Sequence, residues 1–191
     1  AAGEPMALSQ EEICADGWAI ECRLYAEDPY RNFMPSIGRL VRCQPPKQSD
    51  TVRVDTGVVE GSEITVFYDP MIAKLITRGQ DRAAAISAMA AALDSYYVRG
   101  INHNLSFLSA LITHPRFVEG RLTTAFIDEE YPDGFAGAPR DGVILDALLA
   151  ASVLMHHRQV RHEGTIDGKL RNYRPTLGVE WVVCLEGAHH E

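Results

Sequence analysis

Cysteine is scarce in this chain: its 191 residues include 4. No two of them form a CxxC pair, so we expect reduced thiols in a cytosol-like compartment rather than a disulfide framework. Long hydrophobic runs are lacking too. The longest, residues 143–155, is interrupted by Asp146 and Ser152 and is too short to span a bilayer. The net charge of −8 argues against a general nucleic-acid or anionic-membrane binder.

Motifs that cradle nucleotides or present a catalytic serine are also absent. The sequence has no GxGxxG, no Walker loop and no GxSxG. Three histidines lie close together, but the adjacent His156 and His157 would diverge by about 100° on a helix. No cysteine or carboxylate stands at a ligand spacing from them or from His162. We therefore predict no metal site there.

The composition is that of a folded globular protein, with 46% hydrophobic residues. The first residues lack an initiator Met and the basic and apolar regions of a signal peptide. The last residues follow directly on a strand-like segment at 181–185. We therefore expect a segment of a longer protein, able to hold part of an active site without an activity of its own.

The first half of the chain has the alternating pattern of β-strands. In residues 18–26 the apolar side chains point one way, and Glu21, Arg23 and Tyr25 point the other. Further strands are predicted at 39–43, 51–56, 64–68 and 71–77, the last two joined by a turn at Asp69-Pro70. Short spacings without intervening helices favour an antiparallel sheet. The inward set of the first strand is Trp18, Ile20, Cys22, Leu24 and Ala26.

From Asp81 onward, the apolar residues recur at the spacing of a helix. Asp81 is a predicted N-cap, and Gly100 stands where a helix of this pattern would end. A second helix is predicted from near Asn104 to Pro115, and a short third one within 124–131. Residues 1–135 therefore read as an α+β domain, with an antiparallel sheet followed by packed helices.

A second domain is predicted at 136–191, after the small-residue linker 136–139. A helix from Asp141 to about residue 160 is apolar on nearly every side, so it requires surrounding protein, and only one clear strand, 180–185, follows it. Residues 1–135 hold 12 basic and 19 acidic residues, and the remainder holds 6 and 7. We expect this domain to be incomplete and its helix to expose apolar surface, which favours self-association.

Arg23 is the residue with the clearest chemical potential. On the polar face of a strand, two residues from Glu21, it fits a simple ion pair. Its alternative role is to stabilise an oxyanion, because a guanidinium is always charged and donates in a planar fork. Composition and periodicity favour the ion pair and leave the catalytic role open.

Several long motifs resemble the C-terminal domain of biotin carboxylase. They are GWAIECRLYAEDP (17–29), FMPSIGRL (33–40), YDPMIAKLI (68–76), GINHN (100–104) and TTAFI (123–127). They occur in unbroken order over about residues 17–135. The resemblance implies the fold of that domain for residues 1–135.

The resemblance also implies a mechanism. Biotin carboxylases use ATP and Mg²⁺ (or Mn²⁺) to activate bicarbonate, and they carboxylate the ureido ring of biotin through an enolate-like anion. In the family, the arginine of the Glu-Cys-Arg motif stabilises that negative charge, and here this residue is Arg23. Glu21 and Glu27 are then supports of the substrate site, and Lys74 is structural.

After residue 136, the helix from Asp141 with YRP (173–175) and WVV (181–183) resembles the bridging domain of acyl-CoA carboxylase α subunits. There an antiparallel barrel encloses a helix that contacts the carboxyltransferase. The resemblance implies a truncated bridging domain, with a long buried helix and the first strands of an incomplete β-barrel. It also implies a hetero-oligomer with a carboxyltransferase β subunit. No aromatic residue of the kind that packs homodimeric bacterial biotin carboxylases occurs between Pro46 and Val52, which favours the same assembly.

Propionyl-CoA is the substrate that we predict for the parent enzyme. The alternatives are a methylcrotonyl-CoA or acetyl-CoA carboxylase, or a non-catalytic assembly module. The ATP-grasp region and the biotinyl domain of the family lie outside this sequence, so we predict that the chain alone is inactive and binds no cofactor. The expected location is the bacterial cytoplasm or the mitochondrial matrix.

Overall fold

The computed structural model describes residues 2–137, 142–166, 168, 178, 180–185 and 188–190. The chain divides into two compact units, Ala1–Ala138 and Pro139–Glu191. No helix of the described residues is both long enough and apolar enough to cross a membrane. The assignment of the two units to named domains stays a prediction.

The first unit is built on a three-stranded antiparallel sheet of β1 (Trp18–Tyr25), β8 (Met71–Gly79) and β6 (Val52–Thr56), with β8 in the centre. Around it lie short antiparallel pairs and helices. The pairs are β2 (Glu27–Asp28) with β3 (Met34–Pro35), β4 (Gly38–Arg39) with β7 (Glu63–Ile64), and β5 (Arg42–Gln44) with β9 (Tyr97–Arg99). The helices are α1 (Arg82–Ser95), α2 (Leu105–Thr113), α3 (Pro115–Val118) and α4 (Phe126–Glu130), with two 3-10 turns, η1 (Gln10–Glu12) and η2 (Pro29–Arg31).

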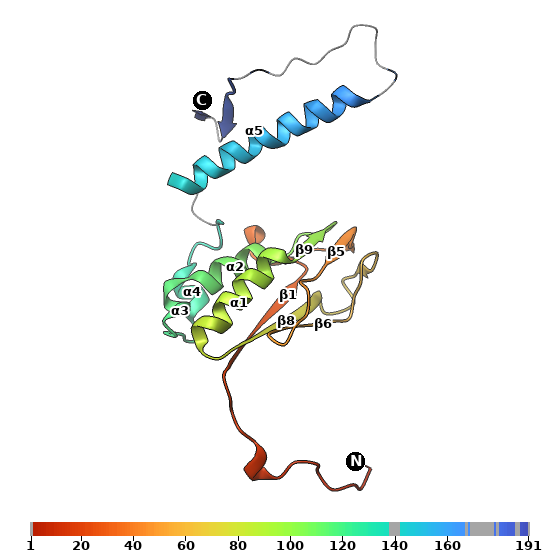
Figure 1. Cartoon of the computed structure of the whole chain (residues 1–191), viewed down its shortest axis with the longest axis vertical. Coiled ribbons are helices and arrows are strands. Elements are labelled where there is room, and N and C mark those ends of the chain that lie inside the picture. Colours follow the sequence, from red (N-terminus) through yellow and green to blue (C-terminus); the bar gives the residue numbers. More distant parts are fainter. Residues whose placement is uncertain are drawn as a thin grey trace. The chain divides into compact units, whose positions relative to one another are not determined.

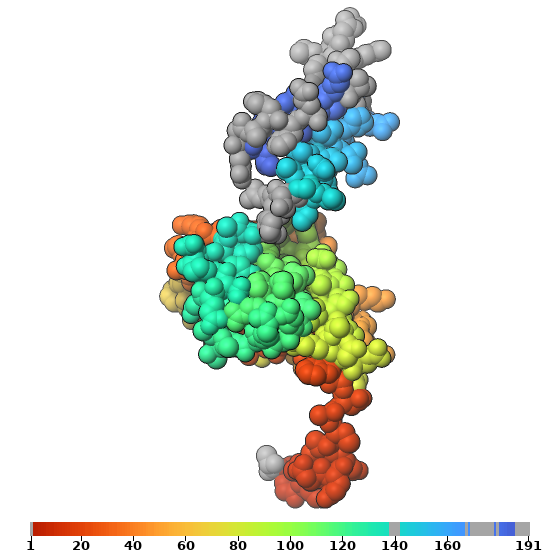
Figure 2. Space-filling model, turned by 90° about the vertical axis from the view of Figure 1, so that its left-hand side faces the viewer, coloured from red at the N-terminus to blue at the C-terminus, as the bar shows by residue number. Residues whose placement is uncertain are grey.

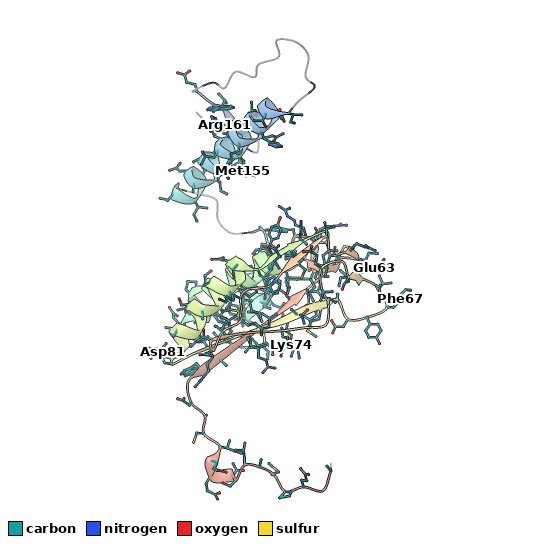
Figure 3. All side chains as sticks on the ribbon, turned by 45° about the vertical axis from the view of Figure 1, so that its right-hand side comes forward. Glu63, Phe67, Lys74, Asp81, Met155 and Arg161 are labelled. Atoms are coloured by element: carbon teal, nitrogen blue, oxygen red, sulfur yellow. The ribbon has the colours of Figure 1, made fainter. Side chains whose placement is uncertain are left out.

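The core lies between the sheet and α1, which packs on one face of β1 and β8 (Figure 1). The side chains of α1 to α4 form a continuous surface over this side in Figure 2. Burying the inner face of β1 against Met89 and Leu93 of α1 removes apolar area from water, at roughly 25 cal/mol per Å². The opposite face of the sheet stays open. Lys74 points away from the side that carries α1 (Figure 3).

The predicted α+β class is confirmed, and most elements lie near their expected places. Ile20, Cys22, Leu24 and Ala26 are buried as predicted. Asp81 caps α1 by accepting a hydrogen bond from the Ala84 amide at 2.7 Å. Trp18 is an exception. It is 53% exposed, because it begins the strand beyond the reach of the core.

Two predicted strands are wrong in extent. The strand at 39–43 is two strands, β4 and β5, because the chain changes partner at Leu40, whose backbone pairs with Gly61 and Ser62. The strand at 64–68 ends at Ile64, and it pairs with β4 rather than with β8. Phe67 lies in the loop that follows and is 90% exposed (Figure 3). In a segment this short, the pattern of apolar residues does not distinguish a loop from an edge strand.

The end of α1 also differs from the prediction. The helix ends at Ser95, and the next residues form β9, which pairs with β5. Gly100 is therefore no helix cap. It has φ +109°, and a Cβ there would collide with the Arg39 carbonyl, so the close approach of two backbone segments requires glycine. This contact depends on partners about sixty residues away, which local periodicity does not report.

The second unit contains α5 (Gly142–Thr165) and a short antiparallel pair, β10 (Val183–Leu185) with β11 (Ala188–His190). The rings of His156 on α5 and Trp181 lie 5.2 Å apart. No described residue of α5 is buried, so the expectation of a buried helix is not met by the described part of this chain. The expectation of exposed apolar surface is met, since Val143 is 83% and Met155 is 72% exposed. The enclosing barrel stays a prediction.

This exposed apolar surface leads to an expected self-association. Light scattering should give the chain a mass above its own 21.1 kDa that rises with concentration, because association removes the exposed apolar side chains of α5 from water. Replacing Val143, Leu154 and Met155 together with serine should restore the mass of one chain. The matched control is serine at Met6, Leu8 and Ile13, which are also exposed but lie in the first unit. A wild-type chain that stays monomeric at all concentrations contradicts the prediction.

Candidate functional site

The open face of the sheet carries a row of charged side chains that begins with Arg23 on the edge strand β1. The register places Arg23 of β1 opposite Lys74 of β8, and Lys74 opposite Asp55 of β6. Because side chains alternate along a strand, the buried neighbours Cys22 and Leu24 force Arg23 onto this open face. The row therefore presents its charges on the side of the sheet away from the core.

Arg23 is held in place by an ion pair within its own strand. Its Nε donates to Glu21 Oε1 at 2.8 Å, and the two side chains are 56% and 40% exposed. Hydrogen bonds to Glu21 and Tyr25 raise the pKa of Arg23, so its charge is permanent. The contacts with Glu21 and Tyr25 engage only part of the five N–H donors of the guanidinium. The other N–H donors of the Arg23 guanidinium suit an oxyanion bound above the sheet.

The backbone that carries Arg23 is clamped by a residue from the start of α2. Asn104 lies at the free edge of β1, where its backbone N–H donates to the Tyr25 carbonyl at 3.2 Å. Its side-chain Oδ1 accepts from the Tyr25 N–H at 2.9 Å, and its Nδ2 donates to the Arg23 carbonyl at 3.1 Å. Asn104 is 5% exposed. Asn104 thus makes the hydrogen bonds to the backbone of Arg23 and Tyr25 that a neighbouring strand would otherwise make.

Glu27 lies apart from this row. It lines a cavity of about 500 Å³ together with Asn104, Phe33 and Phe107, and it is not the carboxylate paired with Arg23. Burial raises the pKa of Glu27, and the nearby Asp69 charge raises it further. Asn104, which donates to the Arg23 carbonyl, lines the same cavity. Its predicted role as a support of the substrate site stays a prediction, as does that of Glu21.

The environment of Glu27 leads to a pH-dependent expectation. A folded-state pKa above the ordinary value of about 4.3 means that stability from this group is present at low pH and lost as the pH rises. Glu27→Gln should therefore raise the urea midpoint at pH 7, with a smaller gain near pH 4. Glu63→Gln, at an exposed position on β7, is the control and should change neither midpoint. A lower midpoint for Glu27→Gln at pH 7 would show that its charge makes a favourable contact.

Two further residues lie next to Arg23: Cys22 precedes it in β1, and Lys74 lies opposite it on β8. Among the described residues, no three His, Cys, Asp or Glu side chains are grouped so that they could hold a metal ion. Cys22 is buried behind Arg23, and burial raises the pKa of its thiol to about 12, which makes it unreactive at neutral pH. Lys74 helps to lower the pKa of Asp55, after the larger effect of the Arg53 hydrogen bond.

Asn104 is the contributor that the sequence pattern missed. The predicted start of a helix near Asn104 is confirmed, since α2 begins at Leu105. A polar residue in this position is typical of an N-cap. The Asn104 side chain, however, makes no capping hydrogen bond to the helix. No pattern in the sequence points from residue 104 to residues 23 and 25.

Known proteins are similar to this chain over much of its length. The family model of the biotin carboxylase C-terminal domain matches residues 21–129, which include Arg23, Glu27 and Asn104. The propionyl-CoA carboxylase alpha chain of Ruegeria pomeroyi is 49% identical over 207 aligned positions, covering 98% of this chain and 30% of that protein. The mitochondrial propionyl-CoA carboxylase alpha chain of Rattus norvegicus is 49% identical, covering 84% of this chain and 22% of that protein.

A solved structure gives the same fold. The biotin carboxylase domain of the Hydrogenobacter thermophilus 2-oxoglutarate carboxylase, a dimer in complex with MgADP, ADP and bicarbonate, superposes with a TM-score of 0.65 at 37% identity. The match covers 68% of this chain and 28% of that one. This chain therefore spans less than a third of the length of each of these relatives. The resemblance expected from the motifs is confirmed: the chain belongs to the biotin carboxylase C-terminal domain family.

Proposed function

We propose that this chain is part of the α subunit of a biotin-dependent acyl-CoA carboxylase, and that Arg23 stabilises negative charge on the ureido oxygen of biotin during ATP- and bicarbonate-dependent carboxylation. One observation carries the proposal. A guanidinium, which is always charged, stands on the open face of a paired strand, in the Glu-Cys-Arg segment that resembles the motif of the family. Fixed donors aimed at a developing oxyanion are among the largest contributors to catalysis.

The residues of this chain have distinct parts in that step. Glu21 orients the Arg23 side chain through Nε, and Asn104 holds the strand backbone beneath it. Biotin supplies the nitrogen that becomes carboxylated. We assign no residue of this chain to ATP or Mg²⁺ (or Mn²⁺), which we place on the remainder of the parent protein. The solved structure of the relative contains MgADP and bicarbonate, which supports a magnesium-bound nucleotide and bicarbonate as ligands of the parent protein.

We further propose propionyl-CoA as the acyl acceptor, with a carboxyltransferase β subunit and a biotinyl domain as partners. The support is the alignment with the Ruegeria pomeroyi protein, which covers 98% of this chain and so includes the second unit. That unit is then a piece of the bridging domain, and α5 contacts the β subunit. Since the relatives include a bacterial and a mitochondrial protein, the expected location is the bacterial cytoplasm or the mitochondrial matrix.

Bicarbonate-dependent ATP cleavage by the longer protein is the test. We expect cleavage that free biotin stimulates, and no turnover by the 191-residue chain alone. If the longer protein cleaves no ATP in the presence of biotin and bicarbonate, the enzyme assignment fails and an assembly module is the better description. Comparing propionyl-CoA with methylcrotonyl-CoA and acetyl-CoA as acceptors then tests the substrate.

A further inference from the structure

Lys74 lies in the middle of the charged row on the open face of the sheet. It belongs to the central strand β8, where it is opposite Arg23 of β1 and opposite Asp55 of β6. Residues directly opposite each other in an antiparallel pair share a face, with Cβ atoms about 4.5–5.5 Å apart. Figure 3 shows Lys74 pointing away from the side that carries α1. The ammonium of Lys74 and the guanidinium of Arg23 are therefore neighbours on the open face.

The arginines on the two strands that flank β8 already have a carboxylate partner. Arg23 Nε donates to Glu21 Oε1 at 2.8 Å. Arg53 donates to both carboxylate oxygens of Asp55, from Nε at 2.8 Å and from Nη2 at 2.6 Å. Each pair joins residues two positions apart within one strand. Lys74 lies on the strand between these two pairs and belongs to neither.

The Lys74 ammonium lacks a carboxylate partner of its own. Among the residues that the structure describes, the ion pairs do not include Lys74. Asp55, which lies opposite it, has both of its oxygens occupied by Arg53. The two ion pairs and Lys74 together carry one positive charge in excess, in a chain whose net charge is −8.

This arrangement is unfavourable for the protein by itself. Lys74 is half-buried, whereas the side chains of Arg23 and Arg53 are 56% and 70% exposed. Like charges directly opposite each other destabilise a sheet, and the partial burial of an unpaired charge adds a desolvation cost. An anion held next to both Lys74 and Arg23 offsets both costs. The charges on this face therefore favour a negatively charged group above the β1–β8 pair.

We propose that Lys74 is a second cationic group of the biotin site, and that it acts with Arg23 on the negative charge of the ureido oxygen. The inference rests on the proposed function and adds one residue to it. The ammonium keeps its protons throughout, so no bond to Lys74 forms or breaks. Arg23 supplies a planar fork with a fixed direction, and Lys74 supplies a compact charge on a flexible stem. The motifs imply only a structural Lys74, and its unpaired charge is the observation that favours this role instead.

Folding and catalysis give opposite expectations for Lys74→Met. Methionine keeps much of the aliphatic stem and loses the charge, so the urea midpoint of the 191-residue chain should equal or exceed that of the wild type. In the longer carboxylase, the same variant should lower the kcat for biotin carboxylation by about tenfold. The KM for biotin should change less, because the charge acts on an anion that develops in the transition state. Lys74→Arg keeps the charge and should recover most of the rate.

The salt dependence of the rate is a readout that a structural role would not change. Raising KCl from about 0.05 M to about 0.5 M should narrow the ratio of wild-type kcat to that of Lys74→Met, because salt screens a partly exposed charge. The matched control is Lys47→Met, which removes an exposed lysine outside the row and should keep the wild-type kcat at both salt concentrations. A ratio for Lys74→Met that is independent of salt contradicts an electrostatic role.

A second set of variants tests where the Lys74 charge lies. Arg53→Met frees the Asp55 carboxylate, which should then pair with Lys74 and draw the ammonium away from Arg23. We expect kcat to fall toward that of Lys74→Met. Adding Asp55→Asn to Arg53→Met leaves Lys74 without a carboxylate again and should restore the rate. A double variant as slow as Arg53→Met contradicts the inference.

The outcomes separate this inference from the function on which it rests. If the wild-type longer protein does not carboxylate biotin, the proposed function fails, and the inference fails with it. If Arg23→Ala loses activity while Lys74→Met keeps the wild-type kcat, the proposed function stands and the inference is wrong. A lower urea midpoint for Lys74→Met in the 191-residue chain also overturns it, because that result assigns Lys74 a structural role.

Discussion

Replacing Arg23 with alanine in the longer carboxylase is expected to lower the kcat for biotin carboxylation by about 10²–10³, the usual effect of removing an oxyanion donor. The affinity for ATP should be nearly unchanged, since we place the nucleotide on another part of the protein. The physical reason is the placement of Arg23 on the open sheet face, with donors left over after its contact with Glu21. The measurement is the rate of biotin carboxylation beside the Kd for ATP.

The matched control for this experiment is Arg121→Ala. Arg121 is also an exposed arginine that pairs with a carboxylate two residues earlier, Glu119, at 2.6 Å. Removing a surface ion pair costs at most about 1 kcal/mol, so this variant should keep its activity. Equal losses of carboxylation and of ATP binding in Arg23→Ala would instead assign Arg23 a structural role. Arg23→Lys keeps the charge but not the planar fork, and we expect it to recover only part of the rate.

Replacing Asn104 with alanine is expected to destabilise the first unit by about 3 kcal/mol, because it leaves the Tyr25 N–H and the Arg23 carbonyl unpaired at a part-buried edge. Urea unfolding of the chain is the measurement. Asn102→Ala, at an exposed position two residues earlier that bonds to Asp28, should cost about 1 kcal/mol or less. A loss for Asn104→Ala no larger than that of Asn102→Ala would show that the clamp contributes little.

The Asn104 variant also connects stability to the proposed site. Asn104→Asp keeps an acceptor for the Tyr25 N–H but loses the donor to the Arg23 carbonyl. In the longer carboxylase we expect this variant to lower kcat while the KM for biotin changes less, because the Arg23 guanidinium is displaced rather than removed. A merely structural role would reduce the amount of folded protein without changing the kcat of the folded fraction.

Local sequence patterns predicted the secondary structure well where the geometry of a single strand or helix determines which residues are apolar. The alternation around Cys22 and Leu24 placed a strand with one buried face, and the helical spacing after Asp81 placed α1. Both signals are short-range, since the period of apolar residues reflects the geometry of a single strand or helix. The patterns failed where pairing with residues far away in the sequence determines where a strand or helix ends. Gly100 serves the β5–β9 pairing rather than the end of α1, and Leu40 separates two strands with different partners.

The candidate site divides in the same way. The family, the strand that bears Arg23 and the face of that strand on which Arg23 stands all follow from contiguous residues, because sequence motifs and the alternation along a strand are local properties. Two features became visible only in the folded chain: Asn104 clamps the strand that bears Arg23, and Glu27 lines a cavity rather than the charged row. These contacts join residues far apart in the chain, or depend on where a backbone turns, and each forms only after the sheet and helices have packed.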